Sequence, residues 1–282
     1  MSETLRWTCP TCKDSVGTRF CGRCGEEPLP ARDLTFRGLA EKLVHALTSI
    51  DARAMRTLRR LLLSPGELTV AWTTGVRKPY VPPFQLFLIA NVIFFAIQSL
   101  TGETVFSSAL DSHLHHQDWS EFARSLVDRR LAAKHIDLEA YAPIFDRAVV
   151  LNAKSFIVLM TIPFALLLPL VFIRKHRPFM AHLAFSLHLY TFLLLLFCAS
   201  LIAARFSALL GFGGLDSAVV DNSLTGANLV ACSVYSYLAI ARVYQTSGAL
   251  RLVQALLVSV SVAAIVVAYR FVLFLLTLYA TT

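Results

Sequence analysis

The stretch HLAFSLHLYTFLLLLFCASLIAA, residues 182–204, decides the fold class of this chain. It contains no Asp, Glu, Lys or Arg, and a helix of this length crosses the roughly 30 Å hydrocarbon core of a membrane. Similar uncharged runs occupy residues 79–102, 155–173, 222–241 and 252–269. Only 16% of the residues are charged, against about 25% in soluble domains. The sequence therefore predicts an all-α polytopic membrane protein with about five transmembrane helices.

The uncharged runs place the spans at about residues 83–100, 155–173, 182–204 and 224–243, with a fifth from Leu252. The second span contains Pro163 and Pro169, so we expect it to be kinked. The end of the fifth span is open because Arg270 precedes another apolar run. The Arg270 guanidinium either reaches the outer headgroups, which we favour, or is buried against protein.

The distribution of charge predicts an orientation. Residues 1–81 carry 13 Lys and Arg against 8 Asp and Glu, and the turn at residues 174–178 adds three more cations. Residues 101–153 instead carry 8 acids against 5 bases. Because cytoplasmic loops are enriched in Lys and Arg, we expect the N-terminus in the cytoplasm and residues 101–153 outside. The start of the chain lacks the pattern of a signal peptide, so we expect a multi-pass protein of the bacterial inner membrane.

Three parts follow from these patterns. Residues 1–28 form a cysteine module, and residues 29–81 form a linker with juxtamembrane amphipathic helices. Residues 82–282 form the transmembrane helical domain, with an outer helical cap at about residues 101–153. Within the cap we expect helices at residues 120–135 and 137–154.

The cysteine module carries the most specific motif in the chain. Cys9, Cys12, Cys21 and Cys24 form two CxxC pairs separated by eight residues, which is the spacing of a zinc ribbon. Four thiolate ligands close the coordination sphere, so the Zn²⁺ is structural, and so short a module needs the metal to fold. Disulfides and an iron–sulfur centre are the alternatives. The cytoplasmic location disfavours disulfides, and the paired short knuckles favour zinc over a cluster.

The charges around these cysteines bear on the partner. Lys13, Arg19 and Arg23 would attract nucleic acid, but Asp14 and the glutamates that follow the last cysteine dilute the positive charge. We therefore expect a cytoplasmic protein partner and consider nucleic acid unfavoured. The sequence leaves the oligomeric state open.

The region before the first span is predicted to lie on the membrane surface. In DARAMRTLRRLLL, residues 51–63, Arg53, Arg56 and Arg60 share one helix face, opposite apolar residues. We expect these arginines to meet anionic lipid headgroups.

The motif SPGE predicts a new helix after the arginine-bearing segment. Ser64 would be the N-cap, with Pro65 at the first helical position and Glu67 completing a capping box. Gly75 is expected to end this helix in a left-handed conformation.

Polar side chains inside the spans mark a candidate intramembrane site. Its members are Asn91, His182, His188, Tyr235 and Arg242. The simpler interpretation is hydrogen bonding between helices, because two histidines six residues apart cannot both face one metal from one helix. His113, His115 and His116 lie in a polar stretch that we expect to be a solvated loop rather than a metal site.

Several of these features together resemble an uncharacterised bacterial multi-pass membrane family, a domain of unknown function with an N-terminal zinc ribbon. The resemblance rests on CPTC…FCGRCG, on TLRRLLLSPGELTVAWTTGVRKPYVPPF with Pro65, Gly66, Gly75, Arg77, Tyr80 and Pro83, and on His182 and His188. It implies a cytoplasmic ribbon on a polytopic bundle, and it implies no reaction.

The function that the sequence favours is a membrane scaffold or adaptor whose zinc ribbon recruits a cytoplasmic partner. The alternative is a small-molecule or lipid transporter that uses the polar residues between the helices. An enzyme is disfavoured because the sequence has no P-loop, GxSxG, HExxH or dinucleotide-binding glycine motif.

Overall fold

The computed structural model of the chain describes residues 7–9, 12–18, 20–23, 52–76, 79–102, 106 and 108–281. The chain divides into two compact units, Met1–Met55 and Arg56–Thr282, which we describe separately. The predicted linker and the first part of the amphipathic region, residues 29–51, lie outside the described residues.

The first unit contains a short antiparallel hairpin. Strand β1 (Trp7–Thr8) pairs with strand β2 (Ser15–Val16), so that Trp7 lies opposite Val16. The hairpin holds the first pair of predicted zinc ligands at its turn.

Helices long and apolar enough to cross a membrane dominate the second unit. Among the described residues four qualify singly: α3 (Pro83–Thr101), α8 (Phe179–Leu209), α9 (Ala218–Val243) and α10 (Gly248–Thr281). A fifth qualifies only if a bent pair of helices is taken as one span. The helices predicted at the first, third and fourth spans are therefore confirmed, and the last helix extends through the apolar run after Arg270.

The predicted second span is not a single kinked helix. Helix α6 (Leu138–Phe156) is followed by a short 3-10 turn, η2 (Ile157–Met160), and then by α7 (Thr161–Val171). The two parts differ in direction by 59°. Pro163 is compatible with the start of a new helix at this point, because it lies in the first turn of α7. A missing N–H in the first turn breaks no helical hydrogen bond.

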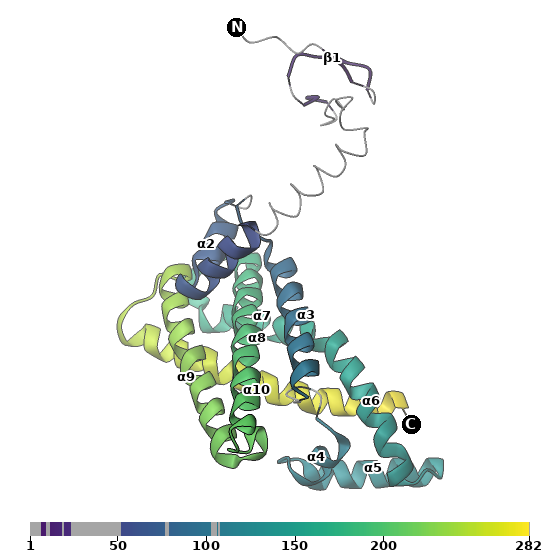
Figure 1. The fold of residues 1–282 in the computed structure, drawn as a ribbon. Helices are drawn as coiled ribbons and strands as arrows, with labels where there is room; N and C mark the ends of the chain where they lie inside the picture. Colours follow the sequence, from purple (N-terminus) through teal and green to yellow (C-terminus); the bar gives the residue numbers. More distant parts are fainter. Residues whose placement is uncertain are drawn as a thin grey trace. The chain divides into compact units, whose positions relative to one another are not determined.

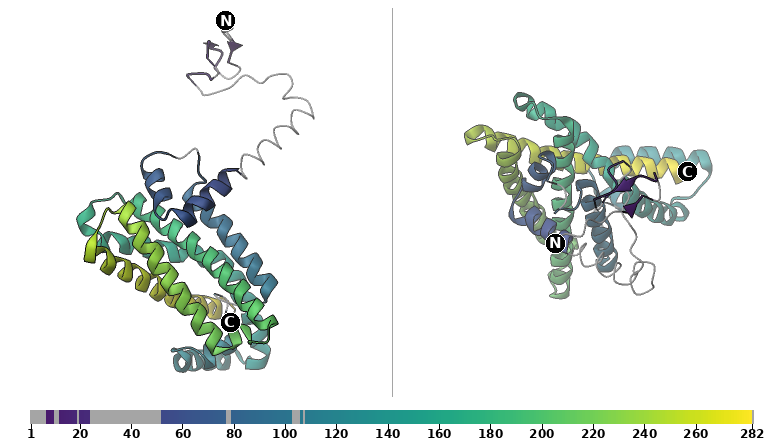
Figure 2. Two further views of the ribbon diagram at one scale, coloured as in Figure 1. Left: turned by 60° about the vertical axis from the view of Figure 1, so that its left-hand side comes forward. Right: turned by 90° about the horizontal axis from the view of Figure 1, so that it is seen from above.

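Different short helices lie at the two ends of the bundle of long helices in the second unit (Figure 1). Helix α2 (Glu67–Thr73) lies where α3 begins, whereas α4 (Leu110–His115) and α5 (Ser120–Lys134) lie at the opposite end (Figures 1 and 2). The helices predicted for the cap are thus confirmed as α5 and α6.

Helix α6 is also paired along the last third of α10. The Tyr141 hydroxyl and Thr281 Oγ1 lie 2.6 Å apart, and the Tyr269 hydroxyl donates to the carbonyl of Ala153 at 3.0 Å. Residue numbers rise along α6 as they fall along α10, so the two helices are antiparallel. In Figure 1, α10 crosses behind the other long helices instead of running beside them.

Arg270 lies on the part of α10 that approaches the cap. Its Nη2 donates to Ser108 Oγ at 2.7 Å, and its Nε is buried without a partner among the described residues. This contact favours the second alternative for Arg270, burial against protein.

The end of the bundle that carries α2 is strongly basic. The turn after α7, with η3 (Ile173–Lys175), meets the connection between α9 and α10, because Lys175 Nζ donates to the carbonyl of Gln245 at 3.0 Å. Figure 2 shows the two connections on the same side of the bundle. We call this region, residues 172–178 with residues 242–251, the basic end.

The segment that leads into α3 folds against the same end of the bundle, and we call its described residues, 56–76 and 79–82, the collar segment. Its SPGE motif is a tight turn and not the predicted capping box. The Glu67 N–H donates to the carbonyl of Ser64 at 3.0 Å, and Gly66 has a φ of 85°. Pro followed by a left-handed Gly is the pattern of a type II β-turn, so α2 begins only at Glu67.

The predicted end of α2 is confirmed. Gly75 has a φ of 88°. Its N–H donates to the carbonyl of Trp72, and the N–H of Val76 donates to the carbonyl of Ala71. This pair of hydrogen bonds is a Schellman motif, which satisfies the last carbonyls of the helix.

Candidate functional site

Three of the predicted zinc ligands converge. The sulfur atoms of Cys9, Cys12 and Cys21 all lie within 4.8 Å of one another, and those of Cys12 and Cys21 are 3.4 Å apart. Sulfurs at the corners of a tetrahedral zinc site with Zn–S of about 2.3 Å are about 3.8 Å apart. The arrangement fits a metal ion held by thiolates, while Cys24 lies outside the described residues.

Two backbone hydrogen bonds close the turn between the first two ligands. The Cys9 N–H donates to the carbonyl of Asp14, and the Lys13 N–H donates to the carbonyl of Cys9, both at 2.9 Å. Lys13 occupies the left-handed region with a φ of 63°, where glycine is usual. A strained non-glycine residue of this kind persists only where its surroundings hold it in place.

The described residues of this module form only a small core. Its buried apolar cluster consists of Cys9, Val16 and Cys21, with Trp7 and Cys12 packed against it. Trp7 Nε1 also donates to the carbonyl of Thr18 at 2.8 Å. Because so small a core cannot offset the entropy of ordering the chain, a bound metal would supply most of the stability.

The surface of the module is mixed in charge. Arg23 Nη1 lies 3.4 Å from Asp14 Oδ2, and both side chains are largely exposed. The pairing neutralises one of the cations that could have met nucleic acid, whereas Arg19 lies outside the described residues.

In the second unit, the collar segment contacts α9 through backbone atoms. Arg242 Nη1, on the last turn of α9, donates to the carbonyl of Pro65 at 3.0 Å. At Gly66, a Cβ would lie 2.7 Å from the carbonyl oxygen of Ala239. Glycine is therefore required at position 66 for two reasons: its backbone has a positive φ, and a side chain would collide with α9.

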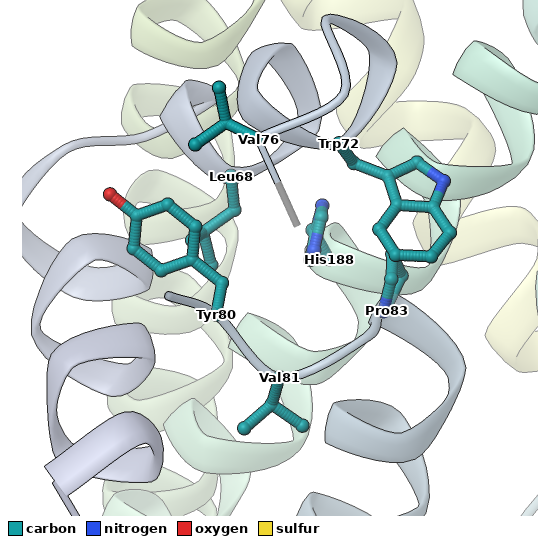
Figure 3. A pocket seen from close by; sticks show the side chains of 7 residues that line it. All are labelled: Leu68, Trp72, Val76, Tyr80, Val81, Pro83 and His188. Carbon is teal, nitrogen blue, oxygen red and sulfur yellow. The ribbon is translucent and has the colours of Figure 1, made fainter. Parts of the chain in front are cut away.

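His188 connects the collar segment to α8. Its Nδ1 lies 2.8 Å from Thr69 Oγ1, and its side chain is 4% exposed. Figure 3 shows the His188 side chain between Trp72 and Tyr80. The Tyr80 hydroxyl points away from His188 (Figure 3). The cavity that His188 lines is otherwise lined by aliphatic and aromatic residues and measures about 10 Å³, which is room for about one water molecule.

His182 has a separate environment, about 1.7 helical turns away on α8. Its Nδ1 lies 2.8 Å from the hydroxyl of Tyr244. The Tyr244 ring is stacked on Phe172, with centroids 3.6 Å apart and planes 2° from parallel. His182 therefore joins α8 to the residues that follow α7 and α9, at the basic end.

The remaining predicted residues also lie apart. Tyr235 is buried and stacks on Phe192 of α8 at 3.9 Å between ring centroids. Asn91 is 9% exposed on α3. Asn228, another polar residue of α9, accepts a hydrogen bond from Ser200 Oγ at 2.9 Å.

These contacts distribute the five predicted polar residues over separate local environments. His188 binds Thr69, His182 binds Tyr244, and Arg242 binds a collar carbonyl. Two further hollows within the described residues are lined almost wholly by apolar side chains. Tyr235 lines one of them, between α9 and the collar segment, and His188 lines neither. A single intramembrane polar site stays a prediction, without support from these contacts.

The three histidines of the cap differ, because His115 and His116 are exposed, as predicted for a solvated stretch, whereas His113 is buried. Residues Leu110–His115 are helical, and His113 is 1% exposed, with its ring 4.8 Å from that of Phe274. Trp119 Nε1 donates to His113 Nδ1 at 3.3 Å. Burial, together with the positive charge of Arg270, lowers the pKa of His113 to about 4.

Sequence reasoning missed the partners of the two membrane histidines. Thr69 lies on the apolar face of a short helix, and Tyr244 directly follows α9. Neither position has a local signal, because each partner is distant in the sequence. Thr57 was also missed: it is fully buried, and its Oγ1 accepts the N–H of Val81 at 3.0 Å.

Comparison with known proteins points to the collar segment. No curated protein matches the chain, and no solved structure matches it. One family model does match, over the collar segment and the first two thirds of α3. It is described as a protein of unknown function (DUF3667), and it matches residues 51–95.

Proposed function

We propose that this chain is an integral membrane scaffold whose zinc-folded N-terminal module binds a cytoplasmic protein partner. The observation that carries the proposal is the convergence of Cys9, Cys12 and Cys21 within 4.8 Å. Cys24 would be the fourth ligand, as the spacing of the two CxxC pairs indicates. With four protein ligands, Zn²⁺ supplies a rigid tetrahedral link and no open position for a reaction.

The second unit would be the membrane anchor. Its long apolar helices are compatible with a multi-pass protein, and we place it in a bacterial inner membrane. The separation of charge between its ends supports an orientation with the basic end and the N-terminus in the cytoplasm. Arg53, Arg56 and Arg60 would face anionic headgroups, although Arg60 also forms an ion pair with Glu67 at 3.0 Å.

The contacts inside the bundle favour a scaffold over a transporter. Among the described residues, His182, His188 and Arg242 each bind a different protein group. A transport site for a polar substrate needs such groups turned toward a shared cavity. Here they join the collar segment and the helix connections to the bundle, which is a structural role.

The test is a double variant of the full chain, Cys9→Ser with Cys12→Ser. Zinc content should fall from about one ion per chain to near zero, because two thiolates cannot hold a structural site. A partner that crosslinks to the wild type in cells should be lost, while the thermal unfolding of the bundle is unchanged.

The matched control is Cys198→Ala, which removes a buried cysteine of α8 far along the sequence from the module. It should keep both the zinc and the partner. If the double variant retains the same crosslinked partners as the control, recruitment by the module is wrong. If it retains the same zinc content, the assignment of the ligands is wrong.

A further inference from the structure

Two cations of the basic end are held by groups other than carboxylates. Lys175 Nζ is fixed by the carbonyl of Gln245 at 3.0 Å. The guanidinium carbon of Arg251 lies 3.7 Å from the ring centroid of Tyr237. A carbonyl or an aromatic ring fixes a cation in place but leaves its charge uncompensated. Both side chains are thus positioned and remain able to attract an anion.

The sequence around these cations contains no acidic residue. Residues 168–182 and 239–254, which form the basic end and the helix turns next to it, contain neither Asp nor Glu. They contain Arg174 and Arg177, which are exposed, in addition to the cations already named. The surface therefore has a positive field that concentrates anions.

A long helix begins at this surface. Helix α10 starts at Gly248 and runs for 34 residues, and its first N–H groups have no partner within the helix. The helix dipole adds positive potential at the same place. Thr246, two residues earlier, is only 6% exposed, and its hydroxyl has no hydrogen-bond partner among the described residues. A buried hydroxyl without a partner is destabilising, so it points to a ligand that the protein itself does not supply.

Packing brings these groups to one junction. Gln254 Nε2 donates to the carbonyl of Val171 at 3.3 Å, so the first turns of α10 lie against the end of α7. Arg251 is three residues before Gln254, about one turn nearer the start of α10, and its guanidinium contacts Tyr237 of α9. Lys175 reaches the connection before α10 from the other side.

We propose that the start of α10 binds a phosphate group, with Lys175 and Arg251 as cations and Thr246 as a hydroxyl donor. The phosphate belongs to an anionic lipid headgroup or to a soluble phosphate. The site differs from the arginines of residues 51–63 and does not depend on the zinc module.

The experiment measures thermal unfolding of the full chain in neutral detergent with phosphatidylcholine as the background lipid. Phosphatidylglycerol is titrated in one arm and inorganic phosphate in the other. The variants are Arg251→Gln and Thr246→Val, and the control is Arg124→Gln, which makes the same charge change at an exposed site on α5, at the opposite end of the bundle (Figure 1). The apparent affinity for the stabilising probe should fall about tenfold in Arg251→Gln and stay at the wild-type value in the control.

Thr246→Val separates binding from stability. It removes the hydroxyl without changing size or charge, so the protein without probe should be as stable as the wild type or more stable, while its response to the probe weakens. Stabilisation by phosphatidylglycerol alone identifies a lipid headgroup, and stabilisation by inorganic phosphate identifies the phosphate group itself. The proposal is overturned if neither probe stabilises the wild type, or if both variants respond as Arg124→Gln does.

Discussion

Replacing Gly66 by alanine tests the contact that fixes the collar segment to the bundle. A Cβ at Gly66 would lie 2.7 Å from the carbonyl oxygen and 3.0 Å from the Cα of Ala239, and these backbone atoms of α9 cannot rotate away. A left-handed conformation costs a non-glycine residue about 1–2 kcal/mol. Overpacking against a fixed neighbour adds about 1–3 kcal/mol. We therefore expect Gly66→Ala to lower the free energy of unfolding by roughly 2–5 kcal/mol.

Gly75→Ala is the matched control, because Gly75 has nearly the same φ, 88°, and a Cβ there would meet nothing within 4 Å. It should cost only the conformational part, about 1–2 kcal/mol. Both variants would be unfolded reversibly in mixed detergent micelles, with helix content followed by circular dichroism. Equal destabilisation of the two variants would contradict the close contact between Gly66 and the backbone of Ala239.

Three further predictions concern other contacts. In a double-mutant cycle, Thr69→Val and His188→Leu should show a coupling energy of about 1 kcal/mol in unfolding experiments, and additive effects would contradict their hydrogen bond. Because burial lowers the pKa of His113 from its ordinary value of 6.5 to about 4 in the fold, its contribution to stability is complete above pH 6.5. That contribution, up to about 3 kcal/mol, should be lost as the pH falls toward 4, since the unfolded chain then binds more protons. His113→Gln should flatten this dependence between pH 7 and pH 5, whereas the exposed His115→Gln should keep it. Under the proposed zinc site, a chelator should abolish the near-ultraviolet signal of Trp7 without lowering the unfolding temperature of the bundle.

Uncharged length was a sufficient signal for α3, α8 and α9, because a run of about 20 apolar residues forms a helix in any membrane context. The same signal is less decisive at residues 155–173, which qualify as a span only together with α6, as a bent pair. There Pro163 lies close enough to the start of the run to begin a new helix, and the composition of the run does not reveal a change of direction.

The turn at residues 64–67 shows where local patterns are ambiguous. Ser-Pro-Gly-Glu matches both a capping box and a type II turn, and both satisfy backbone groups locally. Contact with Ala239 and Arg242 accompanies the turn, and both residues are more than 170 positions away in the sequence. His113 was misjudged for the same reason, because the aromatic ring that covers it belongs to α10.

The cysteine module was the most predictable part of the candidate site. Its ligand spacing is a local property, and the hairpin brings Cys9, Cys12 and Cys21 together as predicted. The polar residues of the spans were less predictable, because helical spacing gives the face of a side chain but not its partner. Their partners, Thr69 and Tyr244, come from short segments whose position depends on the whole bundle.

The pairing of α6 with the end of α10 sets an order of events during biosynthesis. Tyr141 meets Thr281 across 140 residues of chain, so α6 leaves the ribosome long before its partner exists. At about 5–20 residues per second, this interval lasts roughly 7–28 s. During that time Tyr141, Phe145 and Val149, which are buried in the finished protein, face the translocation machinery or the lipid. Closure of this half of the molecule therefore waits for the last helix, and nascent chains that stop short of α10 should be preferred substrates for membrane proteases.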